Sequence, residues 1–318
     1  MGQYIVDLCS VSNSVKIEDH IPHDDCNIFH YTSPQGLSGI ISKHELWFSD
    51  RAYMNDKSEG MYTIQLCIDE VEKLGFTNPT LKKHFIEECN KQRIDPQVDH
   101  FYPFLCSFSL DGDSLCLWNY YTKGAGIKGY NLHFRSNELL KALEPETYPD
   151  REDHTKPIGG KVIYKRDAQI QIIKSIVRKF DELSKERDNN RYDQMTASLL
   201  LDRIRMIGMF FKDECFAIEN EYRIVFSVFL EADCKLVSVG NKQLFRENNG
   251  VFIPYIAVKF KKACLAGITI SPTMEEEQTR QSVKRLATNV CRDDDPADVY
   301  SGLLENGAIK TSRIPVRY

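Results

Sequence analysis

The chain has 318 residues, 42% of them hydrophobic, which is enough for a real core in one large domain or two modest ones. Its formal net charge of -5 excludes a general attraction to nucleic acid but leaves a local basic patch open. No run approaches the length of a membrane span and the first residues lack the features of a secretory signal, so we expect a cytoplasmic protein that does not bind membranes.

Residues 1–27 are polar and weakly patterned, and we treat them as an N-terminal arm. The organised part of the chain begins with a short aromatic strand at 28–32. Ser33 followed by Pro34 is typical of a helix start, with Pro at the first helical position. A second short strand is expected at 45–50, and a polar loop then leads into a helix.

Strands and helices alternate along the rest of the chain, without an internal repeat. A single α+β (mixed α/β) domain over 28–318, with a helical insertion at about 166–211, is the simplest account. We predict helices at 58–74, 79–90, 115–121, 168–209 (two runs, broken near 188–190) and 273–290, and strands at 101–110, 123–134, 161–164, 221–229, 255–260 and 264–270, with a last edge strand in the tail.

His30, Tyr31 and Thr32 stand at the end of the first strand. A His ring nitrogen and a Thr hydroxyl can both hydrogen-bond a ribose, so this strand end is a candidate binding site for a nucleotide. The alternative is a core His that is bonded to the backbone, and the tripeptide alone favours this second interpretation.

Glu219 and Glu221 stand at the entry to a predicted strand. Side chains two apart on a strand share a face, so the two carboxylates would lie side by side if the strand begins early enough. Such a pair can act in proton transfer, and a carboxylate under a sugar can stabilise an oxocarbenium-like transition state. The alternative is an exposed strand end whose charges pair with Arg223 or Lys212.

Asn55, Asp56 and Glu59 lie in the polar loop before the predicted helix at 58–74. Their oxygens could hold magnesium, and with Glu219 and Glu221 could form a two-metal site. The alternative is helix capping, which is the better interpretation of the loop alone. The 10 cysteines show no CxxC and no Cys–His cluster at zinc spacing, so we expect free thiols.

Several segments together resemble a large bacterial family, domain of unknown function 2971. The resemblance runs from about Ile28 to Ile270 and follows the order of the family's motifs. They are HYTSPQGLSGIISKHELWFSD, MNDKSE, LCSFS, LWNYY with GIKGYNLHF, and ENEYRI.

The order of a strand with His-x-Thr, a helix, a strand and a late strand with a Glu is similar, more distantly, to ADP-ribosyltransferases. The resemblance implies that His30 contacts the adenosine ribose of NAD and that Glu221 binds the nicotinamide ribose, with Glu219 as its partner. DKSEGMY at 56–62 also looks like a segment of the poly-ADP-ribose polymerase branch, which makes Tyr62 the aromatic that stacks on nicotinamide. Tyr31 stands where that fold usually has glycine. Tyr31 and Tyr120 are alternatives to Tyr62, and Thr32 and Asn55 complete the candidate binding residues.

The resemblance implies a split β-sheet core and an NAD-dependent transferase that moves ADP-ribose to a macromolecular acceptor, nucleic acid or protein. Such an enzyme would serve as a toxin or antiphage defence effector, with NAD as substrate and without a metal. We expect His30 and Glu221 to line one cleft. The alternatives are a metal-dependent nuclease using Asp56, Glu59, Glu219 and Glu221, and a nucleotide-sensing module without catalysis. The sequence leaves the oligomeric state open.

Overall fold

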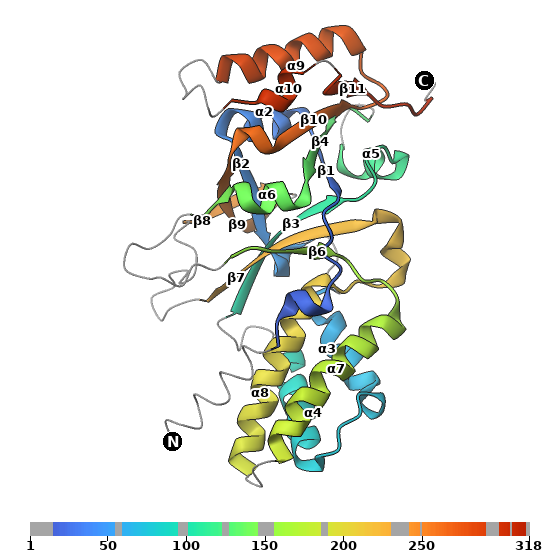
Figure 1. Ribbon diagram of the computed structural model, residues 1–318, viewed down its shortest axis with the longest axis vertical. Coiled ribbons are helices and arrows are strands. Elements are labelled where there is room, and N and C mark those ends of the chain that lie inside the picture. Colours follow the sequence, from blue (N-terminus) through green and yellow to red (C-terminus); the bar gives the residue numbers. More distant parts are fainter. Residues whose placement is uncertain are drawn as a thin grey trace. The chain divides into compact units, whose positions relative to one another are not determined.

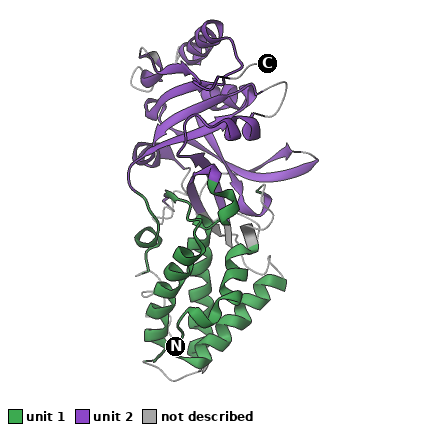
Figure 2. Cartoon of the chain, turned by 90° about the vertical axis from the view of Figure 1, so that its right-hand side faces the viewer, with its two compact units in different colours: residues 1–23, 54–101, 160–217 green, residues 24–53, 102–159, 218–318 purple. Residues whose placement is uncertain are grey.

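The structure, a computed structural model, falls into two units that each draw on distant parts of the sequence (Figure 2). The first unit comprises residues 1–23, 54–101 and 160–217, and the second comprises 24–53, 102–159 and 218–318. Asn55 and Asp56 lie outside the part of the chain that is described. The structure describes residues 15–54, 59–94, 101–122, 127–145, 156–185, 190–229, 242–248, 250–290, 299–305 and 307–315.

A mixed β-sheet forms the second unit, which confirms the α+β class expected from the sequence (Figure 1). Its strands follow one another in space as β11-β10-β4-β1-β3-β2-β9-β5, while β7 pairs with β3 and β8 pairs with β9. The bounds are β1 (Asn27–Thr32), β2 (Glu45–Asp50), β3 (Phe101–Ser109), β4 (Tyr130–Arg135), β5 (Leu143–Glu144), β7 (Glu221–Phe229), β8 (Gln243–Asn248), β9 (Val251–Phe260), β10 (Leu265–Ile270) and β11 (Ile309–Thr311). Along the chain, β6 (Ile158–Lys161) crosses from the second unit into the first.

Strand β3 joins the two halves of this sheet. Phe29 of β1 is paired with Ser109, and Ser49 of β2 is paired with Leu105, so β1 and β2 contact β3 at different places. Ser107 lies midway between the two contacts. At Ser107 the backbone has no strand partner from β1 or β2 among the described pairings, while β7 pairs with β3.

Helices of the second unit cover the sheet and close its main core. Helix α2 begins as the sequence predicts, with the Ser33 side chain accepting a hydrogen bond from the amide of Gly36 at 3.1 Å. Leu37 and Ile41 are buried on one face of α2, as their spacing predicts. The bounds are α2 (Pro34–Lys43), α5 (Leu115–Tyr121), α6 (Ser136–Ala142), α9 (Glu276–Val290) and α10 (Ser301–Leu304).

The described residues of the first unit are mainly helical, and they include the end of β6 and a parallel β-bridge between Ile163 and Phe211. Helix α8 packs against both α4 and α7, and the helices predicted as an insertion near 166–211 are therefore part of this bundle. The buried face of α7 repeats at the three-and-four spacing of a helix that packs on one side. The bounds are α3 (Glu59–Asp69), α4 (Pro79–Ile94), α7 (Arg166–Lys185) and α8 (Asn190–Ile207).

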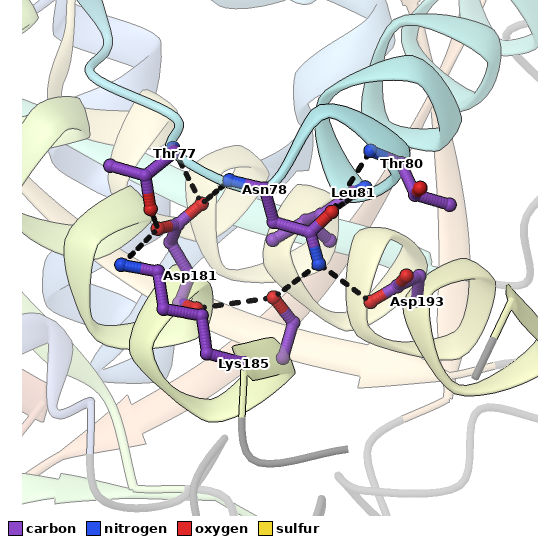
Figure 3. A network of polar contacts seen from close by, with 8 residues as sticks. Thr77, Asn78, Thr80, Leu81, Asp181, Lys185 and Asp193 are labelled. Atoms are coloured by element: carbon purple, nitrogen blue, oxygen red, sulfur yellow. Dashed lines mark hydrogen bonds and ion pairs between the residues drawn. The ribbon is translucent and has the colours of Figure 1, made fainter. Parts of the chain in front are cut away.

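A buried carboxylate fixes the start of α4 to α7 (Figure 3). Asp181 accepts hydrogen bonds from the amides of Thr77 and Asn78, both at 2.9 Å, and from the Thr77 hydroxyl. The Asn78 amide group in turn donates to Ser184 at 3.0 Å and to Asp193 on α8 at 3.2 Å. This network holds three helices together through groups that would otherwise be unsatisfied.

Within the described residues, no helix is long and apolar enough to cross a membrane. The described cysteines are free thiols, in agreement with the prediction from their spacing; they are Cys26, Cys67, Cys89, Cys106, Cys116, Cys215 and Cys264.

Candidate functional site

The strand that carries Glu221 begins at that residue, and Glu219 ends the preceding 3-10 helix (Glu214–Glu219). Between them, Asn220 has a φ of 43°, a left-handed conformation that Asn adopts more readily than most residues. The Ser109 hydroxyl donates to the Glu219 carbonyl at 2.8 Å, which fixes this turn. The expectation that Glu219 and Glu221 stand side by side on a strand is therefore wrong.

The carboxylate of Glu221 is buried, with 4% of the residue exposed, and side chains from two strands, Arg223 and Ser107, hold it. Arg223 donates from Nε to one carboxylate oxygen at 2.8 Å and from Nη2 to the other at 2.9 Å. The Ser107 hydroxyl on β3 donates to the first oxygen. A two-pronged guanidinium contact fixes the carboxylate plane as well as its position.

The His30 imidazole contacts the backbone of β3 at Ser107. Its Nδ1 lies 3.1 Å from the Ser107 carbonyl oxygen. Because a carbonyl only accepts, Nδ1 must carry the proton and donate. Burial lowers the pKa of His30, so the neutral ring with an acceptor at Nε2 is the favoured state.

Glu221 and His30 are both tied to Ser107 but lie on different faces of the sheet. Side chains alternate along a strand, and Tyr222 and Ile224 point into the main core, so Glu221 lies on the opposite face of β7. His30 shares the face of Ile28, a member of that core.

The ring contacts of His30 agree with this assignment. Its ring centroid lies 5.4 Å from that of Phe108, which also belongs to the main core. The expectation that His30 and Glu221 line one cleft is therefore wrong. Strand alternation separates the two side chains, and the hydroxyl and carbonyl of Ser107 link them across β3.

Helix α5 ends with two tyrosines, and the charges of Glu219 and Glu221 act on the second of them. Tyr120 is 43% exposed and Tyr121 is 37% exposed, and their rings meet edge to face with centroids 5.1 Å apart. Burial of its hydroxyl raises the pKa of Tyr121, and the charges of Glu219 and Glu221 raise it further. The phenol of Tyr121 therefore lies in the field of both carboxylates, with part of its ring open to solvent.

Tyr31 and Thr32 have structural roles. Tyr31 is 7% exposed; its hydroxyl donates to the Asp111 carbonyl at 2.9 Å and accepts from the Ser114 amide at 3.0 Å. These bonds anchor α5 and leave the ring covered, which does not suit stacking on a ligand. The Thr32 hydroxyl lies against Gly36, where a Cβ would come within 2.0 Å of it.

The other predicted site residues lie elsewhere. Tyr62 belongs to the first unit, where its hydroxyl donates to Gln169 at 2.8 Å. Asn55, Asp56 and the side chain of Glu59 lie outside the described residues, so the nuclease alternative stays a prediction. In the part of the chain that is described, no group of three or more His, Cys, Asp or Glu side chains is placed to hold a metal ion.

The sequence did not indicate Ser107, Arg223 or Tyr121 as parts of the site. The sequence indicates Arg223 only as one cation that could pair with an exposed strand end. The signal that could have found it is its spacing of two residues from Glu221 on a strand, which puts both on one face. Ser107 carries no such signal, because only the pairing of β3 with β7 brings it to Glu221.

Residues 117–224 match the model of DUF2971, a family of proteins of unknown function. The resemblance to this family is confirmed over these residues, which run from α5 to Glu221 and Arg223 on β7. Neither the search of curated proteins nor that of solved structures finds a match to the chain. The distant resemblance to ADP-ribosyltransferases stays a prediction.

Proposed function

We propose that this protein transfers ADP-ribose from NAD to a macromolecular acceptor, with the nicotinamide ribose bound over Glu221. The proposal is carried by one observation: Arg223 and Ser107 fix the Glu221 carboxylate, and its charge raises the pKa of the partly exposed Tyr121. A fixed negative charge next to an aromatic ring suits a reaction in which a sugar becomes cationic as a ring leaves.

In this reaction the bond between ribose C1′ and the nicotinamide nitrogen breaks, and its electron pair leaves with nicotinamide. The sugar cation then accepts an electron pair from a nucleophile of the acceptor, which loses a proton. Glu221 stabilises the positive charge as it develops. Its carboxylate needs little reorganisation because Arg223 and Ser107 already hold it.

His30 acts on this site through Ser107 and is therefore a positioning residue in the proposal. Its donated hydrogen bond fixes the backbone carbonyl of the residue whose hydroxyl holds Glu221. Tyr120 and Tyr121 offer the exposed aromatic surface for the nicotinamide ring. The acceptor class, nucleic acid or protein, stays a prediction, so the test begins with NAD hydrolysis, in which water is the acceptor.

The test compares wild type with Glu221→Gln for nicotinamide release and for NAD affinity, with and without a chelator. The amide keeps the shape of the carboxylate and removes its charge. We expect a loss of about a hundredfold to a thousandfold in rate with little change in NAD affinity, and no effect of the chelator. Absence of nicotinamide release by wild type, with any activity abolished by the chelator, would overturn the proposal in favour of a metal-dependent nuclease.

A further inference from the structure

Arg246 on β8 is a half-buried cation without a carboxylate partner among the described residues. Its Nη2 donates to the Ser49 hydroxyl on β2 at 3.0 Å, and its Nε is buried with no acceptor in the described part of the chain. A guanidinium carries five N–H donors, and a buried one without an anion is costly. This arrangement therefore has unused capacity to bind an anion.

An aromatic pair stands beside this guanidinium. The rings of Trp47 and Tyr255 lie with their centroids 4.4 Å apart, and the Arg246 guanidinium carbon lies 6.0 Å from the centroid of Trp47. Trp47 is 38% exposed, and its indole N–H donates to Glu45 at 3.0 Å, which fixes the ring. A fixed, partly open indole is a stacking surface for a flat heterocycle.

The cation and the aromatic pair lie on the same face of the sheet as Glu221. Ser49 alternates with the core residue Phe48, so Ser49 and the guanidinium bonded to it lie on the face away from the main core. Ser49 is paired with Leu105 of β3, two residues before Ser107. Residues two apart on a strand are separated by about 7 Å. The face away from the main core therefore carries Arg246, Ser107 and Glu221 one after another.

A second observation links the two charges. Burial raises the pKa of the Cys106 thiol to about 12, with Arg246 lowering it and Glu221 raising it. Both charges therefore act on one buried thiol of β3.

We propose that Arg246, positioned by Ser49, binds a phosphate of a nucleotide whose base stacks on Trp47. A guanidinium fork matches two phosphate oxygens. The aromatic pair of Trp47 and Tyr255 adds a stacking surface for the base, which indicates a nucleotide rather than inorganic phosphate. The inference names the phosphate site of the proposed NAD ligand and rests on the proposed function for the identity of that ligand. Nucleotide binding itself can be measured without any reaction.

The chain carries its own reporter for this test. It has 2 tryptophans, of which Trp118 is fully buried and Trp47 is partly exposed. Quenching of tryptophan fluorescence on titration with ADP-ribose or ADP therefore reports mainly on Trp47. Adenosine provides the comparison ligand that has the base without the phosphate.

We expect ADP and ADP-ribose to bind wild type more tightly than adenosine, and Arg246→Gln to weaken ADP by about tenfold to a hundredfold while leaving adenosine unchanged. Arg246→Lys should restore only part of the affinity, because a lysine cannot make the forked contact. Lys261→Gln, which removes an exposed cation just after β9, is the matched control and should bind like wild type. Unfolding midpoints of the variants confirm that each is folded.

Equal affinity of wild type for ADP and adenosine, or an Arg246→Gln variant that binds ADP as wild type does, would overturn this inference. These outcomes are distinguishable from failure of the proposed function. If ADP binding depends on Arg246 and nicotinamide is never released, the phosphate site stands and the transferase proposal fails. If nicotinamide is released with the same KM in Arg246→Gln, the phosphate site fails and the transferase proposal stands.

Discussion

Arg223 binds both carboxylate oxygens of Glu221 from two residues further along the same strand. The residues are 1% and 4% exposed, so water contributes little to the solvation of either charge. A buried pair of this kind adds little net stability compared with apolar residues, but loss of one partner leaves a buried charge without compensation. The pair is thus a weak source of stability and a strong constraint on geometry.

The first prediction concerns Arg223→Gln. Removal of the guanidinium leaves Glu221 buried without its cation, and we expect a loss of about 3–5 kcal/mol in the free energy of unfolding, measured by urea denaturation. The double variant Arg223→Gln with Glu221→Gln removes both charges and should recover a large part of this loss. Equal stabilities of the single and double variants would show that the cost is one of packing rather than charge.

The second prediction concerns Asp181→Asn at the junction of α4 and α7. Burial tends to raise the pKa of Asp181, but the hydrogen bonds from Thr77 and Asn78 outweigh it and lower the pKa. An amide can accept only at its oxygen, so part of this network is lost, and we expect a cost of about 1–3 kcal/mol in the free energy of unfolding. Glu182→Gln, an exposed acid one residue further along α7, is the control and should cost much less.

Asp181 also predicts a dependence on pH. Its pKa in the folded protein lies below that of the unfolded chain, so its stabilisation is present above the ordinary carboxyl range and is lost as the pH falls through the lowered value. The difference in stability between wild type and Asp181→Asn should therefore shrink as the solution is acidified. A difference that stays constant down to acid unfolding would contradict this assignment.

The third prediction concerns His30 and a higher pH range. Burial lowers its pKa in the folded protein, so just below the ordinary histidine value the unfolded chain binds more protons than the folded one. His30 therefore costs stability as the pH falls below about 6.5. His30→Gln should lose less stability than wild type between about pH 7.5 and 5.5. Parallel stability curves for the two proteins would contradict the lowered pKa of the imidazole.

The sequence predicted local elements well where one segment carries its own signals. The strands at 45–50 and 221–229 and the helix at 115–121 have the predicted bounds, and α2 begins at Pro34 as Ser33 and the proline indicate. β8 was missed because QLFREN lacks a run of β-branched residues, and its pairing with β9 holds it in the sheet. α6 was missed because it is short and follows a strand directly.

The site was harder to predict because it depends on contacts between distant strands. The sequence indicates both His30 and Glu221, but the residue that joins them in the structure is Ser107. Nothing in the sequence near 107 specifies where β1 and β2 leave β3. The alternation of side chains, which separates His30 from Glu221, follows only when the core face of each strand is known.

The last prediction concerns Glu219→Gln. Glu219 stands on the turn before β7, near the Tyr121 hydroxyl, and the described bonds that fix Glu221 come from Arg223 and Ser107 instead. If Glu219 activates the acceptor, loss of its charge should reduce transfer of ADP-ribose and spare slow hydrolysis of NAD. The measurement is nicotinamide release with and without acceptor, with Glu214→Gln, an exposed acid of the same 3-10 helix, as the control. Equal losses of hydrolysis and transfer in Glu219→Gln would instead place Glu219 with Glu221 in the stabilisation of the sugar cation.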